Sequence, residues 1–517
     1  MPSTPQFSAV NRFGLGARAD EVAEVGDDPR GWLLDQLRPA PMPHGYAGLP
    51  SSLELLRIRA GLVQGALQAR QTETDRAALS RAAAPTGDGA QAPSSRRRDA
   101  RAMPEDRRAG ARTLVRESVR EIGLRHAHAA TTALPFQERL VRFWSNHFAV
   151  SADKNAARSQ AAPMEREAIR PHVLGRFADL LLAVETHPAM LLYLDNVASV
   201  GEGSRLAGAA ERRAARRARM AASGIGDETG MEDAPPPRPV RIPGLNENLA
   251  REILELHTLG VDGGYRQDDV RELARAISGW GTPGPRQLAG AEHAHAEHAF
   301  VFRAAAHEPG ARTVLGRRYA EDGLEQGQAI LRDLALHPST ARHLSLKLAR
   351  HFVADAPPPA LVERMAAAYL RSGGALPALY RAMVSDDAAW SPQARKFRTP
   401  DDFVVAAMRA GDLTLGEDPR GLLRLLDGLG QPVFTPRSPA GFPDTTADWA
   451  TGDALRKRVQ AASALAARMR SPLLPVALAR RTVGAADGDL AALLRRAGSP
   501  QEGYALLFAS PAFQWRV

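Results

Sequence analysis

Apolar residues recur at helical spacing along most of the chain. The pattern is clearest in the segment PFQERLVRFWSNHFAV, where intervals of four, three and four residues place on one helix face Phe136, Leu140, Phe143 and His147. A long amphipathic run begins near Ser51, and from Glu321 onwards one helical pattern follows another. The sequence therefore predicts an all-α, mainly helical protein with a compact multi-helix body.

Two polar segments interrupt the helices. Residues 82–112 are rich in Gly, Pro, Ser and charge, a composition that predicts a disordered insert. Residues 201–243 combine Arg, Ala and Pro, and we expect a flexible linker with a short Arg/Ala helix. The expected organisation is an N-terminal helical half over 1–200, this linker, and a C-terminal helical half over 244–517 that carries the main motif block.

One small β-hairpin is expected in the C-terminal half. Its arms are Phe300–Phe302 and Arg312–Leu315, and the sequence HEPGA between them favours a turn. The predicted fold is thus all-α apart from a single hairpin and two disordered Arg-rich inserts.

The net charge of +9 is concentrated in those inserts. Seven Arg against three acids give +4 over 96–112, and six Arg against one Glu give +5 over 205–219, so the rest of the chain is near neutral. Neither stretch interleaves aromatic residues for base stacking. The charge pattern argues against a nucleic-acid partner.

The cysteine count and the apolar runs exclude further classes. With no Cys, any metal site must use His and carboxylate ligands. No segment approaches the roughly 18 uninterrupted apolar residues of a membrane span. The N-terminal residues lack the charged and apolar regions of a secretory signal, which predicts a cytoplasmic protein.

The densest group of polar residues lies between Asn246 and Trp280. On a helical wheel, the face expected to be buried consists of Leu245, Leu249, Ile253 and Leu256. The opposite face consists of Glu247, Asn248, Arg251, Glu252 and Glu255. One interpretation is a solvated face with a ladder of ion pairs, because Arg251 lies four residues from both Glu247 and Glu255. The other is a cleft in which Asn248, Glu252 and Glu255 converge on a cation or a sugar.

Further candidate residues flank this segment. The turn after Gly260 is expected to bring Asp262 and Tyr265 close to His257. Elsewhere, Asn146 and His147 end the FWSNHF helix, and His307 begins the HEPG turn. The predicted catalytic set is Glu252, Glu255, His147 and His307. The predicted ligand-binding set is Asn146, Asn246, Glu247, Asn248, Arg251, Asp262, Tyr265 and Trp280.

A divalent metal is a possible cofactor, since these sets contain several His and carboxylate side chains. A second group, His293, His295 and His298, has metal-binding residue types but lies in an Ala-rich, low-complexity setting that argues against a dedicated site.

Long motifs resemble a bacterial family called domain of unknown function 1800. The motifs are NENLAREILELHTLG, GGYRQDDVRELARAISGW, FVFRAAAHEPGARTVLG, NRFGLGAR, FWSNHFAVS, HPAMLLYLDN, HPSTARHLSLKLARHFV, KFRTPDDFVV and GQPVFTPRSPAGFPD. The resemblance implies a mostly helical fold, a largely uncharacterised function, frequent export and a sulfatase-like partner protein. His257 stands where the family pattern usually has an aromatic residue, and Glu308 follows His307 where it usually has Asp.

Two classes of function remain open. The first is a hydrolase, metal-assisted or acid/base, that uses Glu252 or Glu255 as base, because paired carboxylates do such work when burial separates their pKa values. The second is a non-catalytic binding or accessory protein for a glycan, a peptide or a partner protein. The two differ in whether the candidate residues converge in one pocket.

Overall fold

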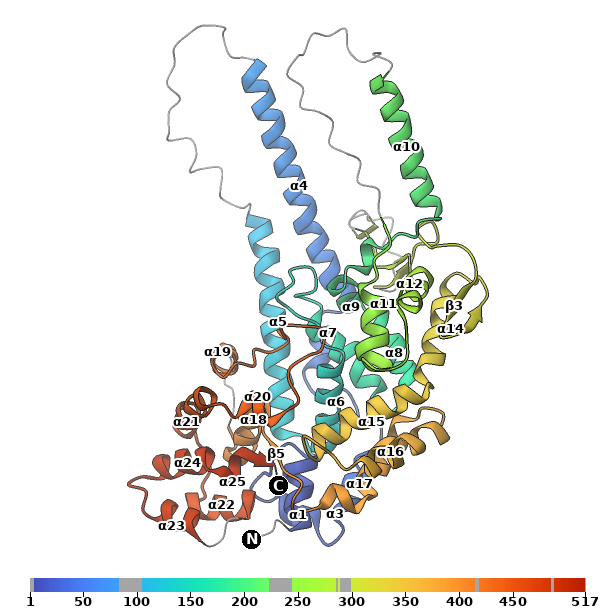
Figure 1. Ribbon diagram of the computed structural model, residues 1–517. Coiled ribbons are helices and arrows are strands. Elements are labelled where there is room, and N and C mark those ends of the chain that lie inside the picture. The colour runs from blue at the N-terminus through green and yellow to red at the C-terminus, as the bar shows by residue number, and fades with distance from the viewer. Residues whose placement is uncertain are drawn as a thin grey trace.

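The computed structural model describes residues 4–82, 105–222, 244–284, 287–288, 299–413, 418–484 and 488–516, with side chains left undescribed at 76–82, 105–107 and 221–222. Helices make up most of this part of the chain, so the predicted all-α fold is confirmed (Figure 1). Before residue 223 the helices are α1 (Pro5–Ser8), η1 (Ala9–Phe13), α2 (Glu21–Val25), α3 (Pro29–Leu34), η2 (Tyr46–Gly48), α4 (Ser52–Ala82), α5 (Glu105–Thr131), α6 (Pro135–His147), α7 (Ala161–Met164), η5 (Glu165–Ile169), η6 (Arg170–His172), α8 (Phe177–Glu185), α9 (Pro188–Tyr193), η7 (Asn196–Ala198) and α10 (Arg205–Ala222).

The second group of helices follows residue 243. They are α11 (Asn248–Glu252), η8 (Ile253–Thr258), α12 (Gln267–Ala276), α14 (Leu324–Ala335), α15 (Pro338–Phe352), α16 (Pro359–Arg371), α17 (Leu376–Ser385), η10 (Asp387–Trp390), α18 (Pro400–Gly411), α19 (Arg420–Gly428), α20 (Thr446–Trp449), α21 (Gly452–Ala466), α22 (Pro475–Val483), α23 (Asp489–Arg495), α24 (Pro500–Ala509) and α25 (Pro511–Gln514). Many begin with Pro in the first turn, where the missing N–H costs no hydrogen bond.

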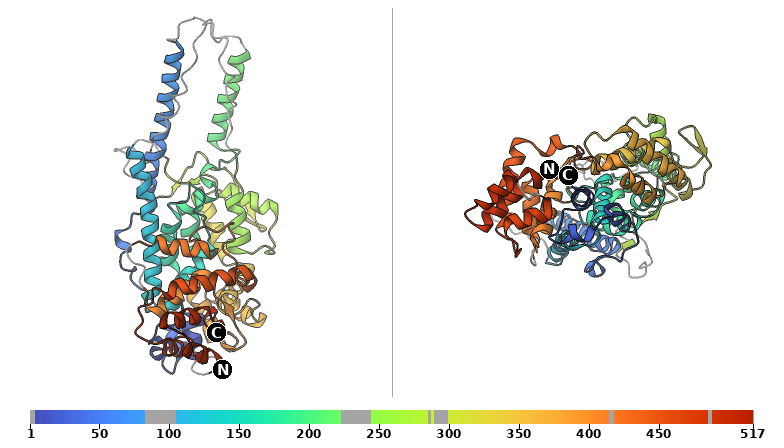
Figure 2. Two further views of the ribbon diagram at one scale, coloured as in Figure 1. Left: turned by 90° about the vertical axis from the view of Figure 1, so that its left-hand side faces the viewer. Right: turned by 90° about the horizontal axis from the view of Figure 1, so that it is seen from below.

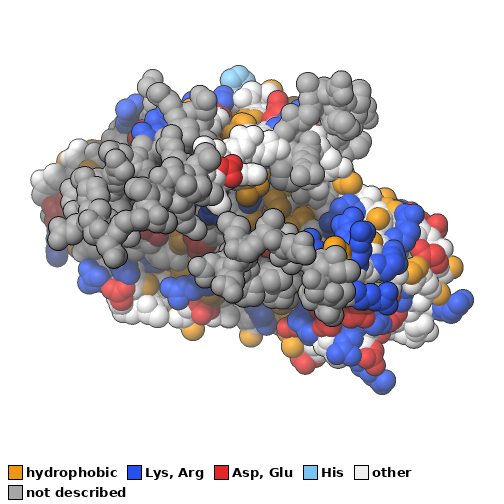
Figure 3. Space-filling model, turned by 90° about the horizontal axis from the view of Figure 1, so that it is seen from above, with side chains coloured by type: hydrophobic (Ala, Val, Ile, Leu, Met, Phe, Trp, Pro, Cys, Tyr) orange, Lys and Arg blue, Asp and Glu red, His pale blue; other side chains and the backbone are white. Residues whose placement is uncertain are grey.

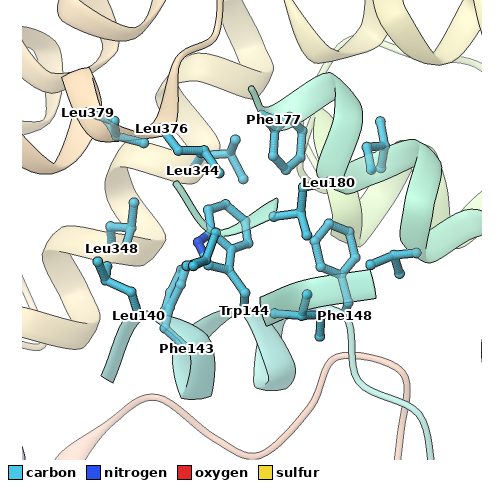
Figure 4. Close-up of a cluster of buried hydrophobic side chains, with 14 of the residues drawn as sticks. Leu140, Phe143, Trp144, Phe148, Phe177, Leu180, Leu344, Leu348, Leu376 and Leu379 are labelled. Atoms are coloured by element: carbon cyan, nitrogen blue, oxygen red, sulfur yellow. The ribbon is translucent and has the colours of Figure 1, made fainter. Parts of the chain in front are cut away.

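The larger hydrophobic core surrounds α6. The predicted stripe of this helix is buried, and it packs against α8, α15 and α17 (Figure 4). Trp144 is fully buried in the centre, and its Nε1 donates to the Tyr380 hydroxyl at 2.7 Å. This core holds α6 rigidly, so the residues at its C-terminal end are fixed in position.

A second core is formed by the C-terminal helices α18, α19, α21, α22, α23, α24 and α25. These helices lie to one side of the α6 core in Figure 1, and α18 packs along α5. A short antiparallel sheet, β5 (Lys396–Phe397) with β6 (Trp515–Arg516), pairs Lys396 with Arg516 where the chain passes between the two cores. The larger core draws residues from both sides of 201–243, and the division into two halves at that segment stays a prediction.

The strands confirm small antiparallel sheets but pair differently from the expected hairpin. The first expected arm, β2 (Val301–Phe302), pairs with β1 (Trp280–Gly281), and the second, β3 (Arg312–Val314), pairs with β4 (Arg317–Tyr319). The tight turn between β3 and β4 has positive φ at both Leu315 and Gly316. Two residues of positive φ match the twist of paired strands, so this local hairpin forms in place of the longer one.

The segment at 248–258 also departs from the expected regular helix. It begins as α11 and continues as the π-helix η8, in which each turn holds one more residue than an α-helix. Leu249 and Ile253 are fully buried as predicted, whereas Leu256 is only half-buried. The wider turn rotates the later residues, so that Leu254 and His257 are buried instead.

Three helices, α4, α5 and α10, rise from one end of the body (Figures 1 and 2). α4 and α5 pack against each other, whereas the outer part of α10 is exposed. Lys and Arg side chains gather toward the right-hand side of this end (Figure 3).

The predicted linker at 201–243 begins with the expected Arg/Ala helix, α10. Its remainder, and most of the predicted insert at 82–112, lie outside the described residues.

No helix among the described residues is long and apolar enough to cross a membrane.

Candidate functional site

A cavity of about 100 Å³ lies where the two cores meet. Its walls come from the C-terminal ends of α6 and α15, the first residues of α18, the β5–β6 sheet and the segment 430–445, which we call the strap. The polar side chains that line this central cavity include Arg142, Asn146, His351, Lys396, Asp402 and Arg516. Phe434 and Phe442 of the strap add aromatic surface.

The strap is fixed to the body by hydrogen bonds at several points. Asn146 donates from Nδ2 to the carbonyl of Phe442 at 3.0 Å and accepts from its N–H at 2.8 Å. The N–H of Ala152 donates to the carbonyl of Phe434 at 2.7 Å. Lys347 on α15 forms an ion pair with Asp444 at 2.6 Å. Gly441 sits against Asn146 with φ of 83°, and a Cβ there would lie 2.3 Å from the Asn146 carbonyl oxygen. Only glycine fits at this position.

The two carboxylates at the start of α18 are held in ion pairs. Asp401 pairs with Arg142 and accepts from His126 at 2.8 Å. Burial by itself would raise the pKa of Asp401, but Arg142 and His126 outweigh it and hold the pKa well below its usual range. Asp402 accepts from Arg139 at 2.9 Å and lies 3.6 Å from Arg516, and these cations likewise outweigh burial and lower its pKa. Both side chains are therefore ionised at neutral pH.

Several buried polar atoms around the cavity lack a hydrogen-bond partner among the described residues. They are Nε of Arg142, Nε2 of His351, Oδ2 of Asp402, and Nε and Nη1 of Arg516. Arg516 is fully buried, and the Asp402 side chain is only 9% exposed. Buried polar groups are almost always hydrogen-bonded, so such a concentration around one cavity indicates a place for an additional polar partner.

Three histidines form a second cluster immediately behind the cavity. His147 follows Asn146 on α6, and its ring centroid lies 6.3 Å from that of His257 and 6.1 Å from that of His343. Its Nε2 donates to the carbonyl of His257 at 3.1 Å. Burial lowers the pKa of His147 well below its ordinary value and that of His343 to about 4. Both are therefore neutral at physiological pH.

His257, one of these three histidines, forms a fully buried pair with Glu185. Nδ1 of His257 lies 2.7 Å from Oε1 of Glu185, and neither side chain is exposed. The pair connects the π-helix η8 to the end of α8.

Glu252 and Glu255 lie on the outer side of this helix. Glu252 is half-buried and has no hydrogen-bond or ion-pair partner among the described residues. Burial raises its pKa, His257 opposes that shift and Glu255 adds to it. Glu255 accepts a hydrogen bond from the Tyr265 hydroxyl at 3.0 Å. Tyr265 was expected to lie close to His257. In the structure its hydroxyl contacts Glu255 of the same segment.

The remaining predicted residues of the segment serve local structure. Asn246 donates to the carbonyl of Leu194 at 3.1 Å and accepts from the N–H of Asn248 at 2.9 Å. Glu247 pairs with Arg251 at 3.4 Å, the predicted ion pair of a solvated face. Asn248 and Asp262 are exposed.

Trp280 and His307 lie in another part of the body. Trp280 is fully buried and contacts Phe300 edge-on at a centroid distance of 5.8 Å. His307 donates from Nδ1 to the carbonyl of Ser278 at 3.1 Å and packs against Phe302. Its contacts come from the β1–β2 region and not from the histidine cluster.

Comparison with known proteins identifies the family. The sequence profile of the family described as Protein of unknown function (DUF1800) matches residues 8–515. The chain belongs to this family. No curated protein and no solved structure matches it.

The DUF1800 match covers every motif that lines the central cavity. FWSNHFAVS contributes Asn146, HPSTARHLSLKLARHFV contributes His351, KFRTPDDFVV contributes Lys396 and Asp402, and GQPVFTPRSPAGFPD is the strap. Of the predicted site residues, the structure places Asn146 at this cavity and His147 directly behind it. It groups Glu252, Glu255 and Tyr265 on the outer side of η8, and it places Trp280 and His307 elsewhere.

The cavity residues His351, Lys396, Asp402 and Arg516 were missed by sequence reasoning. A signal for three of them was present, since they lie in long motifs of polar and aromatic residues, but nothing in the sequence indicated that these motifs meet. Arg516 lies outside any motif that drew notice.

The structure offers no evident metal centre in the part of the chain that it describes. There, no three His, Asp or Glu side chains are grouped so as to hold a metal ion. His293, His295 and His298 lie outside the described residues.

Proposed function

We propose that this protein is a binding protein that holds a small polar ligand, or the end of a longer one, in the central cavity. The observation that carries the proposal is the set of buried atoms without a hydrogen bond on Arg142, His351, Asp402 and Arg516 around one cavity. Leaving a buried donor or acceptor unsatisfied costs roughly 1–3 kcal/mol per group. A ligand that meets several of them gains that energy on binding.

The ionisation of the cavity residues favours binding over catalysis. General acid or base catalysis is most efficient when the pKa of the group lies near the working pH. Here Asp401 and Asp402 have pKa values below the usual range, and the pKa of His351 is lowered well below its ordinary value by burial and the neighbouring Arg516. These groups are suited to fixed hydrogen bonds and ion pairs.

A cavity-filling variant tests the proposal. Ala149 lines the cavity and is 3% exposed, so Ala149→Leu occupies the space without removing a charged group. The matched control is Ala304→Leu, on an exposed residue. We expect ligands from a panel of amino acids, short peptides and oligosaccharides to raise the melting temperature of wild type and of the control, and to have no effect on Ala149→Leu. Equal shifts in all three proteins would contradict a ligand site in the cavity.

A hydrolase centred on Glu252 is the second candidate, and one observation favours it. Glu252 is a half-buried carboxylate without a partner whose pKa is raised, as in many general acids and bases. The test is hydrolysis of chromogenic esters, glycosides and peptide anilides. Under this hypothesis Glu252→Gln lowers the rate by about a hundredfold or more, and Glu247→Gln, which removes a surface ion pair, does not.

The partner and the compartment stay predictions. The family resemblance supports export and a sulfatase-like partner protein, and the alternative location is the cytoplasm. Fractionation of cells that express the untagged protein distinguishes the two locations, and affinity purification from the same cells tests the partner.

A further inference from the structure

We infer that the ligand of the central cavity is an oxyanion, a carboxylate or a phosphate group, bound through the guanidinium groups of Arg516 and Arg142. The inference rests on the proposed function and specifies its ligand. It follows from three features of the structure: an excess of buried positive charge, the nitrogen atoms of two arginines that make no hydrogen bond, and the partly apolar wall of the cavity.

The region next to the cavity contains five buried guanidinium groups and one shared carboxylate. The arginines are Arg12, Arg139, Arg398, Arg458 and Arg516, each at most 2% exposed. The carboxylate is that of Asp402, which accepts from Arg139 and lies within ion-pair distance of Arg516. The cavity lining adds Arg125, Arg142 and Lys396 on the positive side and Asp401 and Asp444 on the negative side. Asp355, which pairs with Lys396, also acts on Arg516. With these residues counted, eight positive charges stand against four negative ones.

The other three arginines, Arg12, Arg398 and Arg458, donate hydrogen bonds to neutral oxygen atoms. Arg12 donates to the carbonyls of Ala389 and Ala394. Arg398 donates to the carbonyl of Phe513 and to Oδ1 of Asn11, and Arg458 donates to Oε1 of Gln514 and to the carbonyl of Arg398. These hydrogen bonds leave Nε of Arg12 and Nη1 of Arg398 without a partner among the described residues, and neutral acceptors do not neutralise the charge.

These arginines remain charged at neutral pH. Burial lowers the pKa of Arg12 and Arg458 to about 10. Burial first, and then the repulsion of Arg139, lowers the pKa of Arg398 to about 9. All of these values lie well above 7. The charges of Arg12 and Arg398 act on Arg516, and this repulsion favours an anion beside Arg516.

Arg516 and Arg142 line this space, and each has nitrogen atoms that make no hydrogen bond among the described residues. Nη1 of Arg516 lies 3.6 Å from Oδ2 of Asp402, and Nε of Arg142 lies 3.9 Å from Oε1 of Glu138. Nη2 of Arg516 donates to the carbonyl of His351 at 2.9 Å, whereas its Nε and Nη1 have no hydrogen bond among the described residues. Nε of Arg142 likewise makes no hydrogen bond there. Lys396, in contrast, already donates to Asp355 and to the carbonyl of Asp444. The rigid fork of a guanidinium matches two oxygens of a carboxylate or a phosphate.

Apolar side chains also line the cavity. Val150, Phe434 and Phe442 line the cavity beside the polar groups. The space therefore suits an oxyanion attached to a short apolar chain, which distinguishes it from a site for a bare inorganic ion.

Isosteric probes test the inference directly. Acetate and acetamide have nearly the same shape and differ in charge, and inorganic phosphate is the second oxyanion. At pH 7 and matched ionic strength, we expect acetate or phosphate to raise the melting temperature saturably and to bind one per chain in calorimetry, and acetamide to do neither. Butyrate is expected to bind more tightly than acetate because it reaches the apolar wall. Comparison of the affinities for acetate and phosphate shows which oxyanion the site prefers.

Variants locate the site. Arg516→Gln removes the fork and is expected to weaken oxyanion binding by at least tenfold, since hydrogen bonds to charged groups are among the strongest. Arg437→Gln, at an exposed position on the strap, is expected to leave binding unchanged. Should Arg516→Gln fail to fold, the acetate and acetamide titrations of wild type still decide whether the cavity binds an oxyanion.

The outcomes separate this inference from the proposed function. If acetamide binds as well as acetate, or if Arg516→Gln folds and binds both oxyanions like wild type, the oxyanion inference is overturned while a binding function stands. If neither the oxyanions nor any ligand of the panel of amino acids, short peptides and oligosaccharides distinguishes wild type from Ala149→Leu, both the inference and the proposed function are overturned.

Discussion

The side-chain amide of Asn146 holds both main-chain polar atoms of Phe442, one at 3.0 Å and the other at 2.8 Å. Asn146 lies in the last turn of α6, a helix of the larger core, and Phe442 belongs to the strap that lines the cavity. The position of the strap is therefore set by a residue of the core. Opening the cavity requires both hydrogen bonds to break together.

Replacing Asn146 by Ala is expected to loosen the strap. The loss of two partly buried hydrogen bonds lowers the free energy of unfolding by about 2 kcal/mol, and the strap becomes a preferred site of limited proteolysis. Urea unfolding and the rate of cleavage within 430–445 measure the two effects. Asn155→Ala, at an exposed position, is the control. An unchanged cleavage rate would show that other contacts hold the strap.

Replacing Asp402 by Asn is expected to be strongly destabilising. The change removes the single carboxylate that Arg139 and Arg516 share and leaves buried cations uncompensated. Breaking a buried pair in this way costs about 3–5 kcal/mol. Asp262→Asn, at an exposed position, is expected to change stability by less than about 0.5 kcal/mol. Chemical denaturation at pH 7 compares them, and a loss below about 1 kcal/mol for Asp402→Asn would mean that the neighbouring arginines do not depend on this charge.

The helices were predictable where one apolar stripe continues along them. The stripe of α6 was identified correctly because Phe136, Leu140 and Phe143 repeat at α-helical spacing and all three are buried. At η8 the same reasoning placed the buried face wrongly beyond Ile253, because a wheel at 100° per residue assumes hydrogen bonds of the α type. Backbone hydrogen bonding, which the side-chain pattern does not report, decides the register there.

The cavity was not predictable for a different reason. Its chemistry depends on residues such as Asp402 and Arg516, which come together through the packing of two cores and one strand pair. Read locally, Asp402 is an ordinary acidic residue in the first turn of a helix. Only the positions of Asn146 and His147 at the end of a strongly amphipathic helix indicated part of the site in advance.

Stability is expected to fall as the pH drops from 6.5 towards 4. Burial depresses the pKa of His343 from 6.5 to about 4, so over this range the unfolded chain binds a proton that the folded protein excludes. The stabilising contribution is complete above pH 6.5 and is lost as the pH falls towards the folded value, up to about 3 kcal/mol for this shift. Thermal unfolding between pH 4 and 8 measures it. His343→Gln is expected to remove this part of the pH dependence. The part that comes from buried His147 and His351, whose pKa values burial also lowers, is expected to remain. Exposed His44→Gln is expected to preserve the whole profile.

The buried pair of Glu185 and His257 is expected to show strong coupling. Both side chains are fully buried at 2.7 Å, so each single change to Ala leaves the other partner unsatisfied. In a double-mutant cycle we expect a coupling energy above about 1 kcal/mol. The surface pair Glu247 and Arg251 is the internal comparison and is expected to give less than about 0.5 kcal/mol. Similar coupling for the two pairs would contradict a special role for burial.

The joining of distant chain segments beside the cavity has a consequence for synthesis of the protein. Asn11 donates to the carbonyl of Thr482, 471 residues further along, and accepts from Arg398, 387 residues further along. At roughly 5–20 residues per second, the ribosome needs on the order of 25 to 95 seconds to supply Thr482 after Asn11. During that time Asn11 lacks Thr482, although neighbouring residues such as Phe13 can already pack against α6. Asn11 must therefore stay without this partner until the last helices are made, and the cavity is among the final parts of the molecule to form.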